Sequence, residues 1–176
     1  MTDRVAIRPM QLSDLAQVHS IDQYSFSMPW PASAYEYELQ ENPYSLLWVA
    51  EISTEGEAPR VVGIIVVWLI LDEAHIASIA VHPDYRSQGI ARMLLITALR
   101  EAIQKGSQIA TLEVRSQNLI AQRLYRRFGF EVVGKRVRYY RDNNEDAFIM
   151  TLTGLGPAYL AQLDQTKLHD DASSQP

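Results

Sequence analysis

The feature that most constrains the fold is a long apolar run, VVGIIVVWLIL, from Val61 to Leu71. The run is rich in β-branched residues, which favour strands, and the turn-forming segment STEGEAP lies directly before it. It is too short to cross a bilayer as a helix, which needs about 20 apolar residues. The run therefore predicts a buried strand in the middle of a sheet, and the natural packing for such a sheet puts helices on both of its faces.

The rest of the chain supplies the other elements of this sheet. The sequence predicts strands at 5–8, 44–52, 60–71, 74–81, 108–115, 130–141 and 146–152, and helices at 13–24, 32–40, 89–105 and 118–128. Gly134 predicts a bulge in the final hairpin. The fold class is therefore α/β (α+β), with a central mixed, mostly antiparallel sheet of about seven strands flanked by about four helices. Residues 1–154 are expected to form the domain, and residues 155–176 a C-terminal helix and tail, partly flexible.

Composition excludes several kinds of chemistry. The chain has no cysteine, which removes disulfides, cysteine-ligated zinc and any acyl-cysteine intermediate. Its four histidines are not spaced as metal ligands, so no metal is expected. A net charge of −5 argues against direct binding of nucleic acid. The charged start MTDRVAIRPM lacks the apolar segment of a signal peptide, so a cytoplasmic protein without membrane contact is expected.

The segment RSQGIA, from Arg86 to Ala91, joins a predicted strand to a predicted helix. A helix N-terminus presents free N–H groups and a partial positive charge, and a turn of small residues lets an anion reach them. Gly89 would allow close approach to the main chain, and Ala91 is too small to block it. From these residues alone, a pyrophosphate site and an ordinary turn that Gly89 allows to bend are about equally supported.

Two further residues, Glu113 and Tyr125, have side chains that can accept or donate a proton. Alternation along the strand puts Thr111, Glu113 and Arg115 on one face, and a glutamate is costly to bury there without a partner. A surface glutamate paired with Arg115 or Thr111 is the simpler interpretation. Tyr125 lies on the apolar stripe of a predicted helix, where anchoring the helix to the sheet is the commoner role of a tyrosine.

The motifs resemble those of a known family. RSQGIA is similar to the Arg/Gln-x-x-Gly-x-Gly/Ala signature of the GNAT superfamily of acetyl-CoA-dependent N-acetyltransferases, and the order of elements is similar to that fold. FSMPWP, DEAHIASIAV, LEVRSQN, AQRLYRRFGF and YYRDNNEDAFIM, in this order between Ser25 and Leu152, resemble the bacterial ribosomal-protein-alanine N-acetyltransferases. The chain departs from the signature at Ala91, where glycine is commoner, and at Ser87 and Gln88, where basic residues are frequent.

The resemblance implies that acetyl-CoA is the cosubstrate, with its pyrophosphate on the amides of this turn and its pantetheine arm paired with the preceding strand. Asn118 is implied to hold the same arm, although the residue could equally cap the helix that follows it. The cofactor-binding residues expected on this basis are Ile79, Ala80, Val81, Arg86, Ser87, Gln88, Gly89, Ile90, Ala91, Arg92 and Asn118.

The resemblance also assigns the catalytic roles. It implies that Glu113 is the general base and Tyr125 the general acid. An α-amine has a pKa of about 7.7–8.0, so a base is needed to free its lone pair, and a phenol can donate a proton to the departing CoA thiolate. Trp30, Tyr139 and Tyr140 are expected to line the acceptor groove, or else to be half-buried packing. His75 is interpreted as a hydrogen-bonded strand residue outside the site.

The function expected from the resemblance is transfer of an acetyl group to the N-terminal alanine of small-subunit ribosomal protein eighteen, so the partner is a peptide N-terminus. Three alternatives remain open: a broader protein N-terminal acetyltransferase, a small-molecule amine acetyltransferase, and a non-catalytic acyl-CoA sensor. The presence of both Glu113 and Tyr125 argues against the sensor. The hairpin segment YYRDNNEDA argues against a small-molecule acceptor, because it resembles the peptide-binding families.

Overall fold

A computed structural model describes residues 4–172, with side chains described through residue 165. Seven strands form one sheet in the order β1-β2-β3-β4-β5-β7-β6. The strands are β1 (Arg4–Pro9), β2 (Ser45–Ser53), β3 (Arg60–Ile70), β4 (Glu73–Val81), β5 (Ile109–Arg115), β6 (Glu131–Tyr140) and β7 (Glu145–Thr153). The helices are α1 (Leu15–Ser25), α2 (Ala32–Gln40), α3 (Ile90–Gln104), α4 (Leu119–Arg127) and α5 (Pro157–Ala172), with short 3-10 helices η1 (Leu12–Asp14) and η2 (Pro83–Tyr85).

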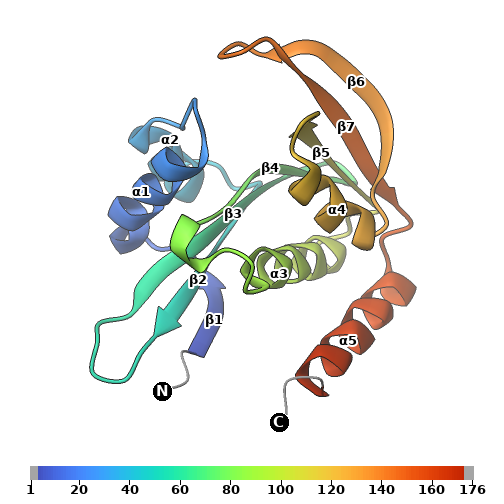
Figure 1. The fold of residues 1–176 in the computed structure, drawn as a ribbon. Helices are drawn as coiled ribbons and strands as arrows, with labels where there is room; N and C mark the ends of the chain where they lie inside the picture. Colours follow the sequence, from blue (N-terminus) through green and yellow to red (C-terminus); the bar gives the residue numbers. More distant parts are fainter. Residues whose placement is uncertain (1–3, 173–176) are drawn as a thin grey trace.

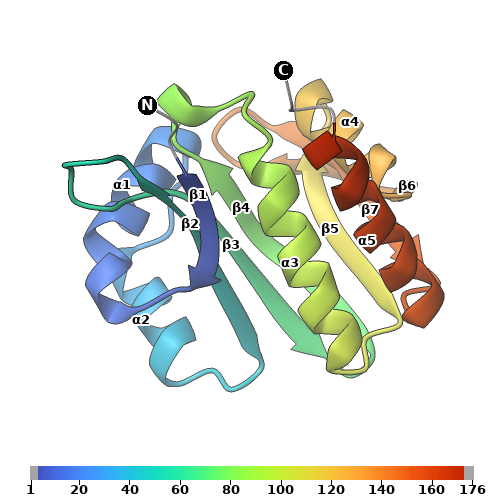
Figure 2. The ribbon, with the colours of Figure 1, turned by 90° about the horizontal axis from the view of Figure 1, so that it is seen from below.

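Helices cover both faces of the sheet, as the apolar run predicted. Helices α1 and α2 lie on one face, and α3, α4 and α5 lie on the other (Figures 1 and 2). Strand β3 is buried from Val61 to Val67. Its side chains alternate between two cores: Ile65 packs with the core that contains α3, whereas Ile64 packs with the core that contains α1.

Two neighbouring strands of the sheet, β4 and β5, are paired along only part of their length. Strands β4 and β5 form the sheet's one parallel pair within the described residues, and their ladder joins only Glu73–His75 to Ile109–Thr111. A register shift in β4 follows, because Val66 pairs with Ser78 while Val67 pairs with Ile76. Beyond His75 the edge of β4 that faces β5 has no strand partner. Main-chain groups along that edge are therefore available to something other than the sheet.

The predicted fold class is confirmed, with two details. The described part of the chain has five α-helices rather than about four, because the segment after Gly154 forms a packed helix. The Tyr159 hydroxyl of α5 donates to the Phe128 carbonyl at 2.8 Å, and Leu163 of α5 is buried against the α3 core. The ladder between β6 and β7 shifts register between Val132 and Gly134, which confirms the predicted bulge.

The described residues contain neither a membrane-spanning helix nor a cluster of metal-binding side chains. Within residues 4–172, no helix has both the length and the apolar surface needed to cross a membrane. In the same part of the chain, His, Asp and Glu side chains do not form any group of three or more that could hold a metal ion.

Candidate active site

The turn before α3 has the geometry of an accessible helix N-terminus. Gly89 is the N-cap of α3 and adopts a left-handed conformation, with φ of 78°. A Cβ added at Gly89 would meet no atom within 4 Å, so conformation rather than crowding requires glycine here. Ser87 is also left-handed, with φ of 63°, and residues 87–89 are exposed. The turn therefore leaves open space in front of the first amides of α3.

The side chains near this turn have structural partners of their own. The Arg86 guanidinium donates from Nε to the Val81 carbonyl at 3.0 Å, which ties the turn to the end of β4. The Asn118 side chain accepts from the Ala121 amide at 3.1 Å, so it caps α4, the alternative role that the sequence allowed. Any ligand at this end would therefore be held mainly by main-chain groups. Ile79, Ala80 and Val81 lie on β4 past the ladder with β5, and Ile90, Ala91 and Arg92 form the first turn of α3.

Glu113 lies on β5, just beyond the point where β4 and β5 separate, and its side chain is 15% exposed. Its carboxylate has partners that the sequence did not suggest. His75 Nε2 lies 3.2 Å from Oε2, and an Arg136 guanidinium nitrogen lies 3.2 Å from Oε1. The simpler interpretation, a surface pair with Arg115 or Thr111, does not describe this geometry. Leu112 and Val114 face the α3 core, so Glu113 faces the α1 side.

A row of stacked rings leads to this carboxylate. His75 stacks on Trp68 of β3 with centroids 5.7 Å apart, and Trp68 stacks on Trp30 with centroids 5.9 Å apart. Trp30, between α1 and α2, is half-buried and donates its main-chain N–H to Asp22 at 2.6 Å. Burial raises the pKa of Asp22, although the Tyr35 hydroxyl and the Trp30 amide both donate to it. Trp30 is thus fixed by packing and by a buried carboxylate.

Tyr125 occupies the opposite face. It lies on α4, is 5% exposed, and packs in the core that contains α3. Burial raises the pKa of Tyr125 well above its usual range, and the neighbouring Tyr140 adds to the shift. Burial also raises the pKa of Tyr140, to about 12, with Arg115 lowering it and Tyr139, Glu113 and Glu145 raising it. Tyr140 is therefore electrostatically close to both the candidate base and the candidate acid.

The tip of the β6–β7 hairpin reaches the α1–α2 segment. Figure 1 shows the hairpin curving out beyond the body of the sheet. Asp142 at its tip accepts from the Ser27 hydroxyl at 2.6 Å and from Arg115 at 2.9 Å. Ser27 and Arg115 hold the pKa of Asp142 below its usual range. We call Ser27, Arg115 and Asp142 the clasp, because together they join three separate parts of the chain.

Two tyrosine rings and two arginines lie along the hairpin beside the clasp. The Arg115 guanidinium lies 3.8 Å from the centroid of the Tyr140 ring, and Tyr139 and Tyr140 contact each other edge to face. Arg136 lies over Tyr139 at 5.3 Å. The structure thus brings Tyr139 and Tyr140 next to the residues around Glu113, whereas Trp30 reaches Glu113 only through Trp68 and His75.

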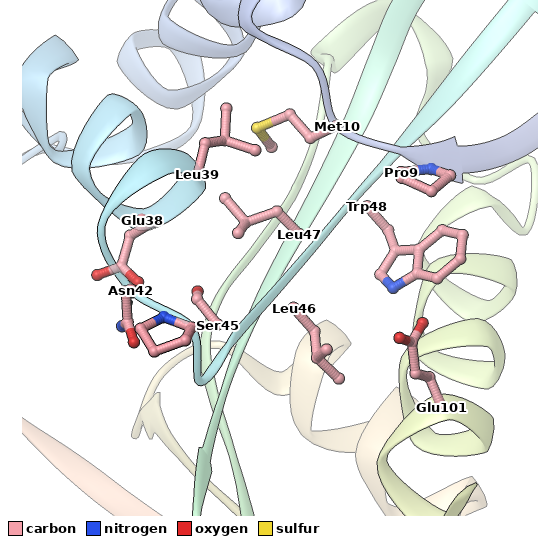
Figure 3. A pocket seen from close by; sticks show the side chains of 11 residues that line it. Pro9, Met10, Glu38, Leu39, Asn42, Ser45, Leu46, Leu47, Trp48 and Glu101 are labelled. Carbon is pink, nitrogen blue, oxygen red and sulfur yellow. Dashed lines mark hydrogen bonds between the residues drawn. The ribbon is translucent and has the colours of Figure 1, made fainter. Parts of the chain in front are cut away.

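A hollow elsewhere on the surface does not mark this site. It has a volume of about 350 Å³ and lies between the ends of β1 and α2, the start of β2, and α3 (Figure 3). Met10, Leu39, Leu46, Trp48 and Glu101 are among its lining residues. None of the residues predicted for catalysis or for cofactor binding lines it. Glu113 and His75 lie where β4 and β5 separate, and not at this hollow.

Comparison with known proteins identifies the family. Residues 15–130 match the model of the Acetyltransferase (GNAT) family. The chain belongs to the GNAT family. It is an acetyl-CoA-dependent N-acetyltransferase, and the resemblance stated from the sequence is confirmed.

Individual relatives show which members of the GNAT family this chain is similar to. The chain is 39% identical over 153 residues to a Bacillus subtilis protein provisionally named a [ribosomal protein bS18]-alanine N-acetyltransferase, covering 87% of this chain and 98% of the relative. It is 31% identical over 148 residues to the Escherichia coli protein of that name, covering 83% and 95%. The crystal structure of the E. coli ribosomal-protein-S18-alanine N-acetyltransferase matches 85% of this chain and 94% of that chain, with a TM-score of 0.74 and 30% identity.

A more distant structure has the same fold with ligands present. The NatC complex bound to Gag peptide and CoA matches 85% of this chain and 98% of that chain, with a TM-score of 0.74 and 25% identity. The described fold is thus shared with a chain of a complex that was crystallised with both a Gag peptide and CoA.

Three residues around the candidate base are not among those that the sequence predicts for the site. His75 and Arg136 contact Glu113, and Trp68 stacks on His75. A usable signal existed for His75: alternation puts it on a strand with apolar Ala74 and Ile76 on either side, so its face differs from theirs. Nothing in the chain order indicates that this face meets Glu113, because the contact depends on which strands become neighbours.

Proposed function

We propose that this enzyme transfers the acetyl group of acetyl-CoA to the α-amine of the N-terminal alanine of small-subunit ribosomal protein eighteen. The observation that supports the acceptor best is the near full-length match to two relatives that carry this activity in their names. The reaction would take place in the cytoplasm, with a peptide N-terminus as partner and without direct contact to nucleic acid or membrane.

Acetyl-CoA would bind across the end of the sheet where β4 and β5 separate. Its pyrophosphate would lie on the amides of residues 87–92, supported by the open left-handed turn at Gly89. The pantetheine arm would pair with the β4 edge from Ile79 to Val81, where β5 leaves main-chain groups without a strand partner. Asn118 would contact the same arm with its side-chain amide while its oxygen caps α4.

The chemical step would use side chains from both faces of the sheet. Glu113, on the α1 face, would take a proton from the acceptor ammonium, directly or through a water. The freed amine would attack the thioester carbonyl, forming the C–N bond, and collapse of the tetrahedral intermediate would break the C–S bond. Tyr125, on the α3 face, would donate its proton to the departing thiolate, and the phenolate would take back, through water, the second proton that the nitrogen loses as the amide forms. Transfer is direct, since the chain has no cysteine to carry the acetyl group.

The acceptor would enter from the α1 face. Tyr139 and Tyr140 would form one wall of its groove, and the segment around Trp30 the other, with the clasp joining the two walls beyond Glu113. Such a groove would admit an extended N-terminus and hold its main chain by hydrogen bonds. The net charge of −5 also favours a cationic acceptor.

Peptide assays with tandem mass spectrometry test this proposal. Peptides that begin Ala-Arg-Tyr should gain one acetyl group on the α-amine, and the same peptides with a formylated N-terminus should not react. Acetylation of many unrelated N-termini at equal rates would indicate the broader N-terminal acetyltransferase. Acetyl groups found only on lysine ε-amines, polyamines or aminoglycosides would show that the acceptor is wrong.

A further inference from the structure

His75 makes a specific contact with the candidate base. Its Nε2 lies 3.2 Å from Glu113 Oε2, and both side chains are mostly buried, at 20% and 15% exposure. The pair His75–Thr111 is the last rung of the ladder between β4 and β5. The His75–Glu113 contact therefore lies at the point where the sheet begins to open, next to the expected path of the thioester.

Neighbouring groups fix the plane of the His75 ring. Trp68 lies nearly parallel to it, with an angle of 14° between the rings, and Trp30 lies behind Trp68 at 16°. Trp68 is itself held by a hydrogen bond from its indole N–H to Glu38 at 3.0 Å. A ring stacked in this way has little freedom to rotate, so its Nε2 stays directed at Glu113.

We propose that His75 is a positioning residue for the acetyl-transfer step, acting through Glu113. This inference rests on the proposed function of the same site. The imidazole donates its Nε2–H to Glu113 Oε2 and fixes the plane of the carboxylate. Oε1, which an Arg136 nitrogen contacts at 3.2 Å, takes the proton from the acceptor ammonium on its second lone pair. That proton stays on Oε1 and leaves to water after the product departs. The Nε2 proton of His75 is not consumed.

Other groups also face this pair. They are Arg136 and Tyr140 of β6, with Glu38 of α2 behind Trp68. Arg136 and His75 hold different oxygens of the carboxylate, so removing the His75 donor changes the contacts of Oε2 alone.

Two substitutions separate positioning from packing. His75→Phe keeps a ring on Trp68 but removes the donor, whereas His75→Gln loses the ring but keeps an N–H donor. We expect His75→Phe to lower kcat about tenfold with the KM for acetyl-CoA unchanged, and His75→Gln to recover most of that loss. Thr111→Val, in the same row of the sheet, should keep the wild-type kcat.

The outcomes decide the proposal whether or not the acceptor assignment holds. All variants are measured on the amine that the wild-type enzyme accepts, so an inactive alanine peptide would count against the proposed function alone. A wild-type rate for His75→Phe would overturn the role of His75. Equal losses in both variants would reduce His75 to packing. Should His75→Phe not fold, His75→Leu takes its place as the variant without a donor, and its kcat is compared with that of His75→Gln in the same way.

Discussion

The turn at Arg86–Ala91 and the surroundings of Glu113 belong to one candidate site but are built by different means. At the turn, consecutive residues supply main-chain amides, and the decisive property is the left-handed conformation of Gly89. Around Glu113, side chains from β4, β5 and β6 converge, and further rings from β3 and the α1–α2 segment support them. A site made of main chain tolerates most side-chain changes, whereas one made of converging side chains can be disabled by deleting a single group.

The largest effect should come from Glu113→Gln. The amide keeps the size of the side chain and an oxygen for His75 but cannot accept a proton. We expect kcat to fall by about 10²–10³-fold, the range of general acid–base catalysis, with little change in acetyl-CoA affinity. Steady-state kinetics and calorimetry measure the two quantities. A kcat within threefold of wild type would remove Glu113 from the chemistry.

Tyr125→Phe should lower kcat by about 10²-fold, because only the proton donor to the thiolate is removed. The ring still fills its buried place beside Phe130, so the melting temperature should hardly change. The matched control is Tyr159→Phe. It removes the partly buried hydroxyl of a tyrosine on α5, which donates to the Phe128 carbonyl and makes no contact with Glu113. If Tyr125→Phe turns over like wild type, Tyr125 is a packing residue and Tyr140 becomes the better candidate for the acid.

Gly89→Asp tests the main-chain half of the site. The change introduces a negative charge and a strained left-handed aspartate where the pyrophosphate is proposed to bind, so calorimetry should show acetyl-CoA binding weakened more than tenfold. Gly56→Asp is a close control, because Gly56 has φ of 85°, has no atom near an added Cβ, and lies in the β2–β3 loop. Equal affinity in both variants would contradict the assignment of the turn.

A smaller effect is expected at the clasp. Asp142→Asn keeps the size of the residue but removes its charge pairing with Arg115, and exposed ion pairs contribute little because solvent screens them. The KM for the acceptor peptide should rise by less than about fivefold, while kcat at saturating peptide stays constant. Glu55→Gln, which removes one charge from the β2–β3 loop, is the control. A changed kcat would mean that the clasp acts on chemistry rather than on acceptor binding.

The smallest effect on activity should come from Arg8→Ala. Arg8 donates to Asp14 and Glu51, outside the site, so the substitution should leave the kinetic constants unchanged and cost about 2 kcal/mol of stability. Burial of Asp14 opposes its charge, but Arg8 and the Gln11 amide outweigh this and lower its pKa. The stabilisation is therefore present at neutral pH and is lost as pH falls through the folded-state pKa.

Urea unfolding at several pH values measures this last effect. The gap in unfolding free energy between wild type and Arg8→Ala should be full at pH 7 and shrink below about pH 4, where aspartates become protonated. Arg4→Ala, an exposed position on the same strand, should change stability by less than about 0.5 kcal/mol at every pH. A gap that does not vary with pH would exclude Asp14 as the partner that matters.

Short motifs were enough to predict the parts of the candidate site that are contiguous in sequence. The glycine turn, Glu113 and Tyr125 could all be named as candidates because their motifs resemble those of a known family, whereas the residue pattern alone favoured simpler roles for Glu113 and Tyr125. Arg136 and His75 could not be assigned to Glu113, because β4, β5 and β6 are separated along the chain by α3 and α4. Their contact follows from the strand order, which no single segment specifies.

The sequence by itself determined the buried strand, although its buried part ends at Val67 and Leu71 is exposed beyond the end of β3. It also determined the order of the elements and the absence of cysteine chemistry, since hydrophobic period and residue type act locally. Only the tertiary structure decided where β4 leaves β5, and therefore which backbone edge is open and which carboxylate lies beside it. It also decided that Trp30, Trp68 and His75 form one stack that ends at Glu113. Such contacts arise from the pairing and packing of distant segments, which follow from the free energy of the whole chain.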